Sequence, residues 1–272
     1  MPAKARKRNN VSISLLAIFN ETYKRFLIIW DYKFNVLTQL MLIGIIFIGA
    51  SFFLGNGHFN PQQLIILFLG YVVWLYARII IMSTGADLVG EAQAGTLEQM
   101  YMTPAPTETL ILGRVLATLF TTTIMVLMTA IALVLILGIS IPLRWEGLVI
   151  LGLTLAGLLG FALILGGLTL IFKQTDALAD LIQNALLFLT GSLLPIGHFP
   201  PWLAFFARTL PITQGIDVLR NVLLNGQSLI AAWDNQSLVW LIVNSSVYLI
   251  IGWVVFKYSE RFAKKQGSLS QY

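Results

Sequence analysis

The residues best suited to a functional role lie in one short polar stretch between two long apolar runs. Residues 91–106 read EAQAGTLEQMYMTPAP. Gly95 can adopt a positive φ angle and so end a helix. Thr96 followed by Gln99 is a capping-box pattern, which starts a new helix directly afterwards.

That new helix is expected to be short. Pro104 ends it, because proline has no N–H and disfavours a helical Thr103. The pattern predicts about two turns over residues 97–102, with Leu97 and Tyr101 one turn apart on an apolar face. A short capped helix of this kind is suited to recognition by a soluble partner protein rather than to catalysis.

Residue types that support other chemistry are scarce. The chain has no cysteine, which excludes disulfides, thiolate zinc sites and cysteine nucleophiles. His58 and His198 fall in separate loops, and no cluster of acids, histidines or serines predicts a metal site or a lipid-cleaving enzyme. The sequence contains no G-x-x-x-x-G-K-[ST] motif, so an ATPase would have to be a separate subunit. The apolar runs also lack a central acid or base of the kind that ion-coupled carriers use.

The amino-acid composition indicates the environment in which these residues lie. The chain is 57% hydrophobic and 11% charged, whereas soluble domains carry about 25% charged residues. The apolar runs are long enough to cross a bilayer as helices and lack the short alternating strands of a barrel. We therefore expect an all-α polytopic membrane protein.

The chain is expected to divide into two parts. Residues 1–33 form a basic arm followed by an amphipathic interfacial helix, and residues 34–272 form one membrane domain. Six spans are predicted in it, at about 34–54, 62–82, 109–138, 147–172, 177–194 and 238–256. The proline-rich region between the last two predicts short helices that lie on the outer surface or re-enter it. Arg78 falls near the inner end of its span, where its side chain can snorkel to the headgroups.

The distribution of cations predicts the orientation. All but three of the 17 Lys and Arg residues fall on the side of the two termini; the exceptions are Arg144, Arg208 and Arg220. By the positive-inside rule, both termini and the polar stretch lie in the cytoplasm.

Two patterns within the spans have ordinary structural interpretations. Gly152, Ala156 and Gly160 recur at four-residue spacing, and small residues let helices approach closely. Packing within the protomer is favoured over a dimer seam. The hydroxyls of Thr118, Thr121, Thr122 and Thr123 are expected to bond carbonyls of the preceding turn rather than to line a substrate path.

The polar stretch resembles the signature of ABC-2-type transporter permeases, a close variant of Glu-x-x-x-Gly-Thr-Leu-Glu-Gln-Leu followed by Thr-Pro. The matching residues here are Glu91, Gly95, Thr96, Leu97, Glu98, Gln99, Met100, Thr103 and Pro104. The outer segment GSLLPIGHFPPWLAFFARTLPITQGIDVLRNVLLNG resembles the proline-rich region of the same family, with Pro211, Asp217 and Arg220 at its characteristic positions. The resemblance is closest to the daunorubicin-resistance-type branch, although EAQAGT replaces the more charged Glu-Arg-Glu-x-Gly-Thr of many members.

This resemblance implies an exporter of the bacterial inner membrane, in which two permeases form the pathway and two ATPase subunits dock beneath. The helix over 97–102, including Tyr101, would be the coupling helix. ATP and Mg would be bound by the partner subunit, with no cofactor in this chain and no nucleic acid as partner. An outer gate is expected around Pro195, Pro200, Pro211, Asp217 and Arg220.

The resemblance implies an amphipathic drug-like or lipid-like substrate. Export of a polysaccharide or lipid-linked glycan is an alternative, and an autonomous channel or carrier is another.

Overall fold

The computed structural model describes residues 19–93, 95, 107–142, 144–172 and 175–266, and these residues form helices and connecting turns without a strand. Residues 19–31 form a first helix. The others are α2 (Lys33–Leu54), α3 (Pro61–Gln93), α5 (Thr107–Leu137), α6 (Trp145–Phe172), α7 (Asp176–Leu189), η1 (Ile196–His198), α8 (Pro201–Arg208), α9 (Pro211–Leu224), α10 (Leu229–Asp234) and α11 (Ser237–Gln266). The all-α class is therefore confirmed.

Among the described residues, five helices are long and apolar enough to cross a membrane: α2, α3, α5, α6 and α11. The expected span 177–194 corresponds to α7, which has 14 residues. At 1.5 Å per residue α7 is about 21 Å long, whereas a bilayer core is about 30 Å thick. The sequence-based count of six thus exceeds the number of helices of spanning length, because the apolar run continues beyond α7 into an irregular segment.

Two helices are longer than their apolar runs. α3 continues to Gln93 and α11 to Gln266, although their spans were expected to end near residues 82 and 256. Gly95 follows α3 with φ of +67°, which confirms the prediction that it ends this helix. We call the end of the bundle where α3 and α11 finish the basic end, because the last turn of α11 holds Lys264 and Lys265.

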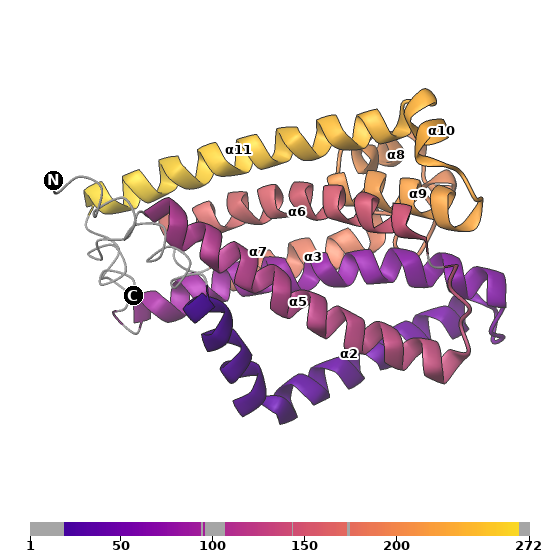
Figure 1. The fold of residues 1–272 in the computed structure, drawn as a ribbon, viewed down its shortest axis with the longest axis horizontal. Coiled ribbons are helices and arrows are strands. Elements are labelled where there is room, and N and C mark those ends of the chain that lie inside the picture. The colour runs from indigo at the N-terminus through magenta and orange to yellow at the C-terminus, as the bar shows by residue number, and fades with distance from the viewer. Residues whose placement is uncertain (1–18, 94, 96–106, 143, 173–174, 267–272) are drawn as a thin grey trace, which may run out of the picture.

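The centre of the bundle is formed by α3, α6 and α11, which run side by side along the long axis (Figure 1). Their contact depends on small residues. A Cβ at Gly160 would collide with the backbone of Tyr248, and one at Gly252 would collide with the backbone of Gly160. Gly160 therefore packs within the protomer as predicted, whereas a Cβ at Gly152 would meet nothing within 4 Å.

The N-terminal helix is separated from α2 by a break at Tyr32, whose φ of −97° and ψ of 26° are not helical. The two helices form an open V beside α3 and α5 (Figure 1). The expected basic arm falls in residues 1–18, which lie outside the described part of the chain.

The opposite end of the bundle, which we call the far end, is built from the short helices η1 to α10 (Figure 1). Prolines define their boundaries, since proline fits the first turn of a helix. Pro201 and Pro211 begin α8 and α9, and Pro195 and Pro200 immediately precede η1 and α8. α9 is buried along most of its length against α3, α6 and α11, so it is inserted into the bundle and does not lie on its surface.

Candidate functional site at the basic end

The predicted coupling residues are positioned by the two longest neighbouring helices. Glu91 lies in the last turn of α3, and Gly95 follows it. The remaining predicted coupling residues lie outside the described residues: Thr96, Leu97, Glu98, Gln99, Met100, Tyr101, Thr103 and Pro104. The chain resumes with α5 at Thr107, so this segment connects the end of one long helix to the start of the next.

The helix that leads into this segment is longer than a bilayer requires. Its 33 residues extend about 50 Å, some 20 Å more than the hydrocarbon core. α5 has 31 residues and packs against α3. The segment between them is thus flanked by two long helices that pack against each other.

The N-terminal helix is joined to both of these helices by ion pairs. Arg25 Nη2 donates to Asp87 Oδ2 of α3. Glu21 Oε1 lies 3.9 Å from Arg114 Nε of α5. These four side chains are between 14% and 31% exposed, and pairs with this much solvent contact contribute about 1 kcal/mol or less each. Their value is therefore positional, because they fix helix 19–31 against the helices that flank the predicted coupling segment.

Sequence reasoning missed these pairs. The sequence predicted only an amphipathic interfacial helix in this region, without contacts to the other helices. The available signal was the placement of Asp87 and Arg114 just inside the two helices that flank the polar stretch.

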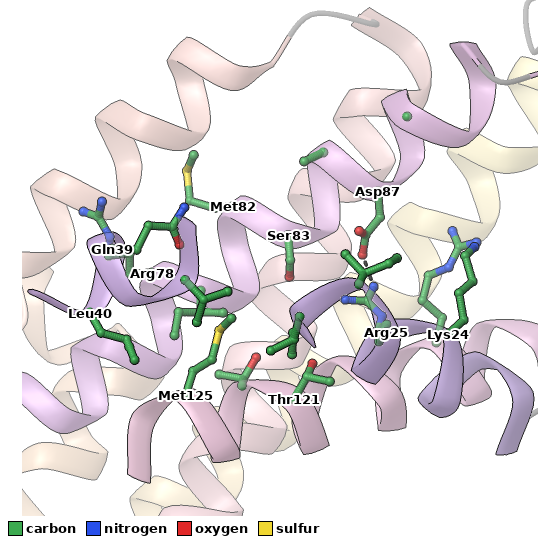
Figure 2. A pocket seen from close by; sticks show the side chains of 18 of the residues that line it. Lys24, Arg25, Gln39, Leu40, Arg78, Met82, Ser83, Asp87, Thr121 and Met125 are labelled. Atoms are coloured by element: carbon green, nitrogen blue, oxygen red, sulfur yellow. Dashed lines mark hydrogen bonds and ion pairs between the residues drawn. The ribbon is translucent and has the colours of Figure 1, made fainter. Parts of the chain in front are cut away.

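A cavity of about 770 Å³ lies next to the two ion pairs, between helix 19–31, α2, α3 and α5. Figure 2 shows Lys24, Arg25 and Asp87 at one side of it, and Arg78 beside Gln39 at the other. Met82 and Met125 lie between these polar groups. We call this space the basic-end cavity; its size is in the range of ligand pockets, about 300–1,000 Å³.

Arg78 does not behave as the sequence suggested. Instead of snorkelling outward, its Nη1 donates to Gln183 Oε1 of α7 at 3.1 Å, and its Cζ lies 5.6 Å from the centre of the Trp74 ring. Trp74 Nε1 also donates to the backbone oxygen of Gln183 at 2.8 Å. The side-chain and backbone oxygens of Gln183 thus both accept hydrogen bonds from α3, which explains how Gln183 is tolerated at 1% exposure.

The expected gate residues occupy the opposite end of the bundle. Arg220 is 8% exposed and donates from Nε and Nη2 to Ile66 O, at 3.1 and 2.8 Å, and from Nη2 to Ser192 O at 3.2 Å. Its hydrogen bonds therefore join α9 to α3 and to the segment after α7. Asp217 lies in α9, which is not a spanning helix. The pKa of its carboxyl is raised because burial disfavours the charged form, and the positive charges of Arg220 and Arg208 offset only part of this effect.

Neither histidine contributes to a metal site in the described part of the chain, where no group of three His, Cys, Asp or Glu side chains comes together. His198 Nδ1 lies 3.3 Å from Pro195 O, so it takes part in the local turn.

The long apolar helices, linked by short loops and packed through glycines, define a polytopic α-helical membrane protein. A model of the ABC-2 type transporter family matches residues 14–224, which is most of the chain. The protein therefore belongs to the ABC-2 type transporter family, and its membrane domain is a permease component rather than an ATPase. It is also similar to ABC transporter G family member 20 of Dictyostelium discoideum, with 24% identity over 204 residues. That match covers 72% of this chain and 26% of the relative, so the chain spans about a quarter of the relative's length.

Proposed function

We propose that this chain is the membrane subunit of an ATP-driven exporter, and that it moves an amphipathic drug-like or lipid-like substrate out of the cytoplasm or its leaflet. A second copy would complete the pathway, and separate ATPase subunits would bind at the basic end. The observation that supports this most is the arrangement there. Three helices, 19–31, α3 and α5, are joined around the segment that matches the coupling signature.

In this proposal, closure of the ATPase subunits displaces the helix predicted over residues 97–102. Because α3 and α5 are continuous from that segment to the far end, both move with it. The ion pairs of Arg25 with Asp87 and of Glu21 with Arg114 make helix 19–31 move with them. The far end then responds through α9, which Arg220 attaches to α3.

The sixth crossing of the proposed topology is made by α7 together with the segment that follows it. α7 enters from the basic end, and α8 and α9 return into the outer half of the bundle as re-entrant helices. The exposed aromatic side chains of α8, Trp202, Phe205 and Phe206, suit the headgroup region, where aromatic rings are favoured. Both termini then lie in the cytoplasm of a bacterium and the far end lies outside.

The proposal is tested by purifying the tagged chain gently from its native host and identifying associated proteins by mass spectrometry. We expect a stoichiometric soluble protein with a G-x-x-x-x-G-K-[ST] motif. Replacing Leu97 and Tyr101 together with Asp should remove it, because two carboxylates on the apolar face oppose docking. Lys265→Asp, an exposed position at the end of α11, serves as the control and should retain the ATPase.

The outcomes separate the candidate functions. Loss of the ATPase from the Leu97/Tyr101 variant, with normal membrane insertion, supports the coupling role. An ATPase that still binds this variant, and still drives transport, contradicts it. Transport by the purified chain alone, with no ATPase recovered under several mild conditions, indicates an autonomous channel or carrier.

A further inference from the structure

A groove at the far end combines aromatic rings with a carboxylate, and the export mechanism does not use it. It has a volume of about 660 Å³ and lies where α10 meets the first turns of α11 (Figure 1). We propose that this far-end groove binds an amphiphilic organic cation, with the ammonium group beside the carboxylate and the apolar part along α11. The residues that line it are Trp233, Asp234, Gln236, Val239, Trp240 and Val243.

A tight turn between the two helices brings both tryptophans to the groove. Gln236 N donates to Trp233 O at 3.0 Å, and Trp240 N donates to Gln236 O at 2.9 Å. Gln236 itself adopts φ of +62°, a left-handed conformation that is uncommon for a residue with a Cβ. Conformations of this kind concentrate at ligand sites, because the surrounding structure must hold them against their cost. The turn thus places two indole side chains on the walls of one groove.

The charge of the groove favours a cation. Asp234 is the one charged residue among the described residues that line it. Its side chain is exposed and forms no ion pair or hydrogen bond with another described residue. A bound cation would therefore face a carboxylate for which no lysine or arginine of the lining competes.

The two indole rings are also open to a cation from outside the chain. Elsewhere in the described residues, tryptophan rings lie 5.3 to 5.6 Å from a cation of the same chain, in the pairs of Trp30 with Lys33, Trp74 with Arg78 and Trp253 with Lys257. Trp233 and Trp240 form no such pair with a described residue, and they are 56% and 49% exposed. The face of an indole ring attracts cations, and aromatic residues grouped around a quaternary ammonium are a known means of recognising it.

The remaining wall indicates that the cation carries an apolar part. Val239 and Val243 lie one turn apart on α11, within a helix long and apolar enough to cross a membrane. A small hydrated ion would leave these side chains and the indole faces without a contact. A zwitterionic headgroup would bring a phosphate towards Asp234, which disfavours it. An ammonium group with an apolar tail satisfies all of the walls.

Exposed tryptophans at a membrane surface can also serve only as anchors. Trp202 of α8 is 71% exposed and does not line the groove, so it suits that role alone. An anchor requires no carboxylate beside it. The two interpretations therefore differ in what Asp234 contributes.

The proposal is tested with the full-length chain in neutral maltoside micelles, with no ATPase or ATP present. The probe is hexyltrimethylammonium, and its affinity is measured by saturation-transfer difference NMR on its methyl protons. Hexylphosphocholine carries the same ammonium and tail with an added phosphate, and hexanol carries the tail alone. We expect the probe to bind about tenfold more tightly than either, which corresponds to about 1.4 kcal/mol.

Three variants locate the bound probe. Asp234→Asn keeps the size of the side chain but removes its charge, and should weaken binding about fivefold, equivalent to ~1 kcal/mol. Trp240→Leu removes one aromatic face and should have a similar effect, whereas Trp240→Phe, with a weaker face, should fall between Trp240→Leu and the natural chain. Trp202→Leu is the matched control and should bind the probe as the natural chain does.

The other outcomes contradict the proposal in distinguishable ways. Equal binding of hexylphosphocholine would indicate a site for the headgroup of a membrane lipid rather than for a net cation. Equal binding of hexanol would show adventitious apolar binding only. Unchanged affinity in Asp234→Asn would leave the tryptophans as membrane anchors, and it remains decisive if the Trp240 variants fail to fold. Because transport plays no part in the measurement, its result is independent of whether the chain is an exporter.

Discussion

At the scale of single residues, the packing of the far end depends on Gly70, which leaves space for the guanidinium of Arg220. Arg220 reaches the backbone oxygen of Ile66 in α3, and Gly70 lies one turn further along the same helix. A Cβ at Gly70 would lie 2.5 Å from both Arg220 Nη2 and Ser192 O. Gly70 therefore forms the notch that admits the guanidinium, although glycine in a helix interior costs about 0.5–1 kcal/mol relative to alanine.

This arrangement predicts that Gly70→Ala destabilises the protein, in spite of the better helix propensity of alanine. The added methyl group displaces Arg220 from its two carbonyl acceptors, and crowding of this kind costs about 1–3 kcal/mol. Arg220→Leu should cost a similar ~2–4 kcal/mol, because it removes the hydrogen bonds between α9, α3 and Ser192. Thermal unfolding in detergent, followed by loss of helicity, measures both effects.

The control for Gly70 is Gly49, which lies within α2 and would have nothing within 4 Å of an added Cβ. Gly49→Ala should raise the melting temperature slightly. A Gly70→Ala variant as stable as Gly49→Ala would show that the Arg220 hydrogen bonds do not hold α9 in place.

Residue-level expectations from the sequence succeeded where the interaction is local. Thr118, Thr121 and Thr123 bond carbonyls within their own helix, as their hydroxyls can in any helix. The Thr122 hydroxyl has no hydrogen-bond partner, and Arg220 donates to Ile66 O of α3 and to Ser192 O. The contacts of Arg220 were not predictable, because Ile66 lies 154 residues away in the chain and a single sequence does not show which distant segments pack together.

At the scale of elements, the important feature is the attachment of helix 19–31 to α3 and α5. The isolated helix has 13 described residues, a length at which helices in water are marginal. The Arg25–Asp87 ion pair gives it a defined position relative to α3. If that position matters for coupling, the sign of each charge should matter less than their complementarity.

A charge exchange tests this idea. Arg25→Asp places two acids together at the end of α3 and should detach the helix, lowering ATP-driven transport by about tenfold if ~1.4 kcal/mol of coupling is lost. The double variant Arg25→Asp with Asp87→Arg restores an opposite-charge pair and should recover much of the activity. Transport in vesicles containing the permease and its ATPase gives the measurement. Equal defects in the single and double variants would mean that the pair has no role in coupling.

The elements themselves were predictable in position but not in length. Residues 83–93 read STGADLVGEAQ and lack a long apolar run, so the sequence suggested that α3 stops near residue 82. The structure continues it because one face is covered, with Leu88 buried among Leu163, Leu170 and Phe256. Conversely, the run 177–194 is apolar throughout most of its length, yet the helix ends at Leu189 and Gly191 adopts φ of +78°. Tertiary contacts of Leu88 thus extend α3, and the turn at Gly191 follows the early end of α7.

At the scale of the whole molecule, two ends with different chemistry are joined by continuous helices. The basic end contains the ion pairs, the cavity and the last turn of α11. The far end contains the proline-bounded helices η1 to α10 (Figure 1). α3 and α11 each extend the full distance between them. This polarity is the property on which the proposed export direction depends, because the ATPase and the outer gate must lie on opposite sides of the membrane.

Labelling of single cysteines tests this arrangement, and the absence of native cysteine makes each introduced thiol unique. Ser228 is exposed at the far end, so Ser228→Cys should react with an impermeant maleimide in intact cells. Because the Ser228 hydroxyl caps α10 by accepting from Ala231 N, the neighbouring exposed Asn225→Cys provides a second site without that role. Lys265→Cys, on the last turn of α11, should react only after the membrane is opened. The positive-inside rule predicts this pattern, and the reverse pattern would place the basic end outside and exclude docking of a cytoplasmic ATPase there.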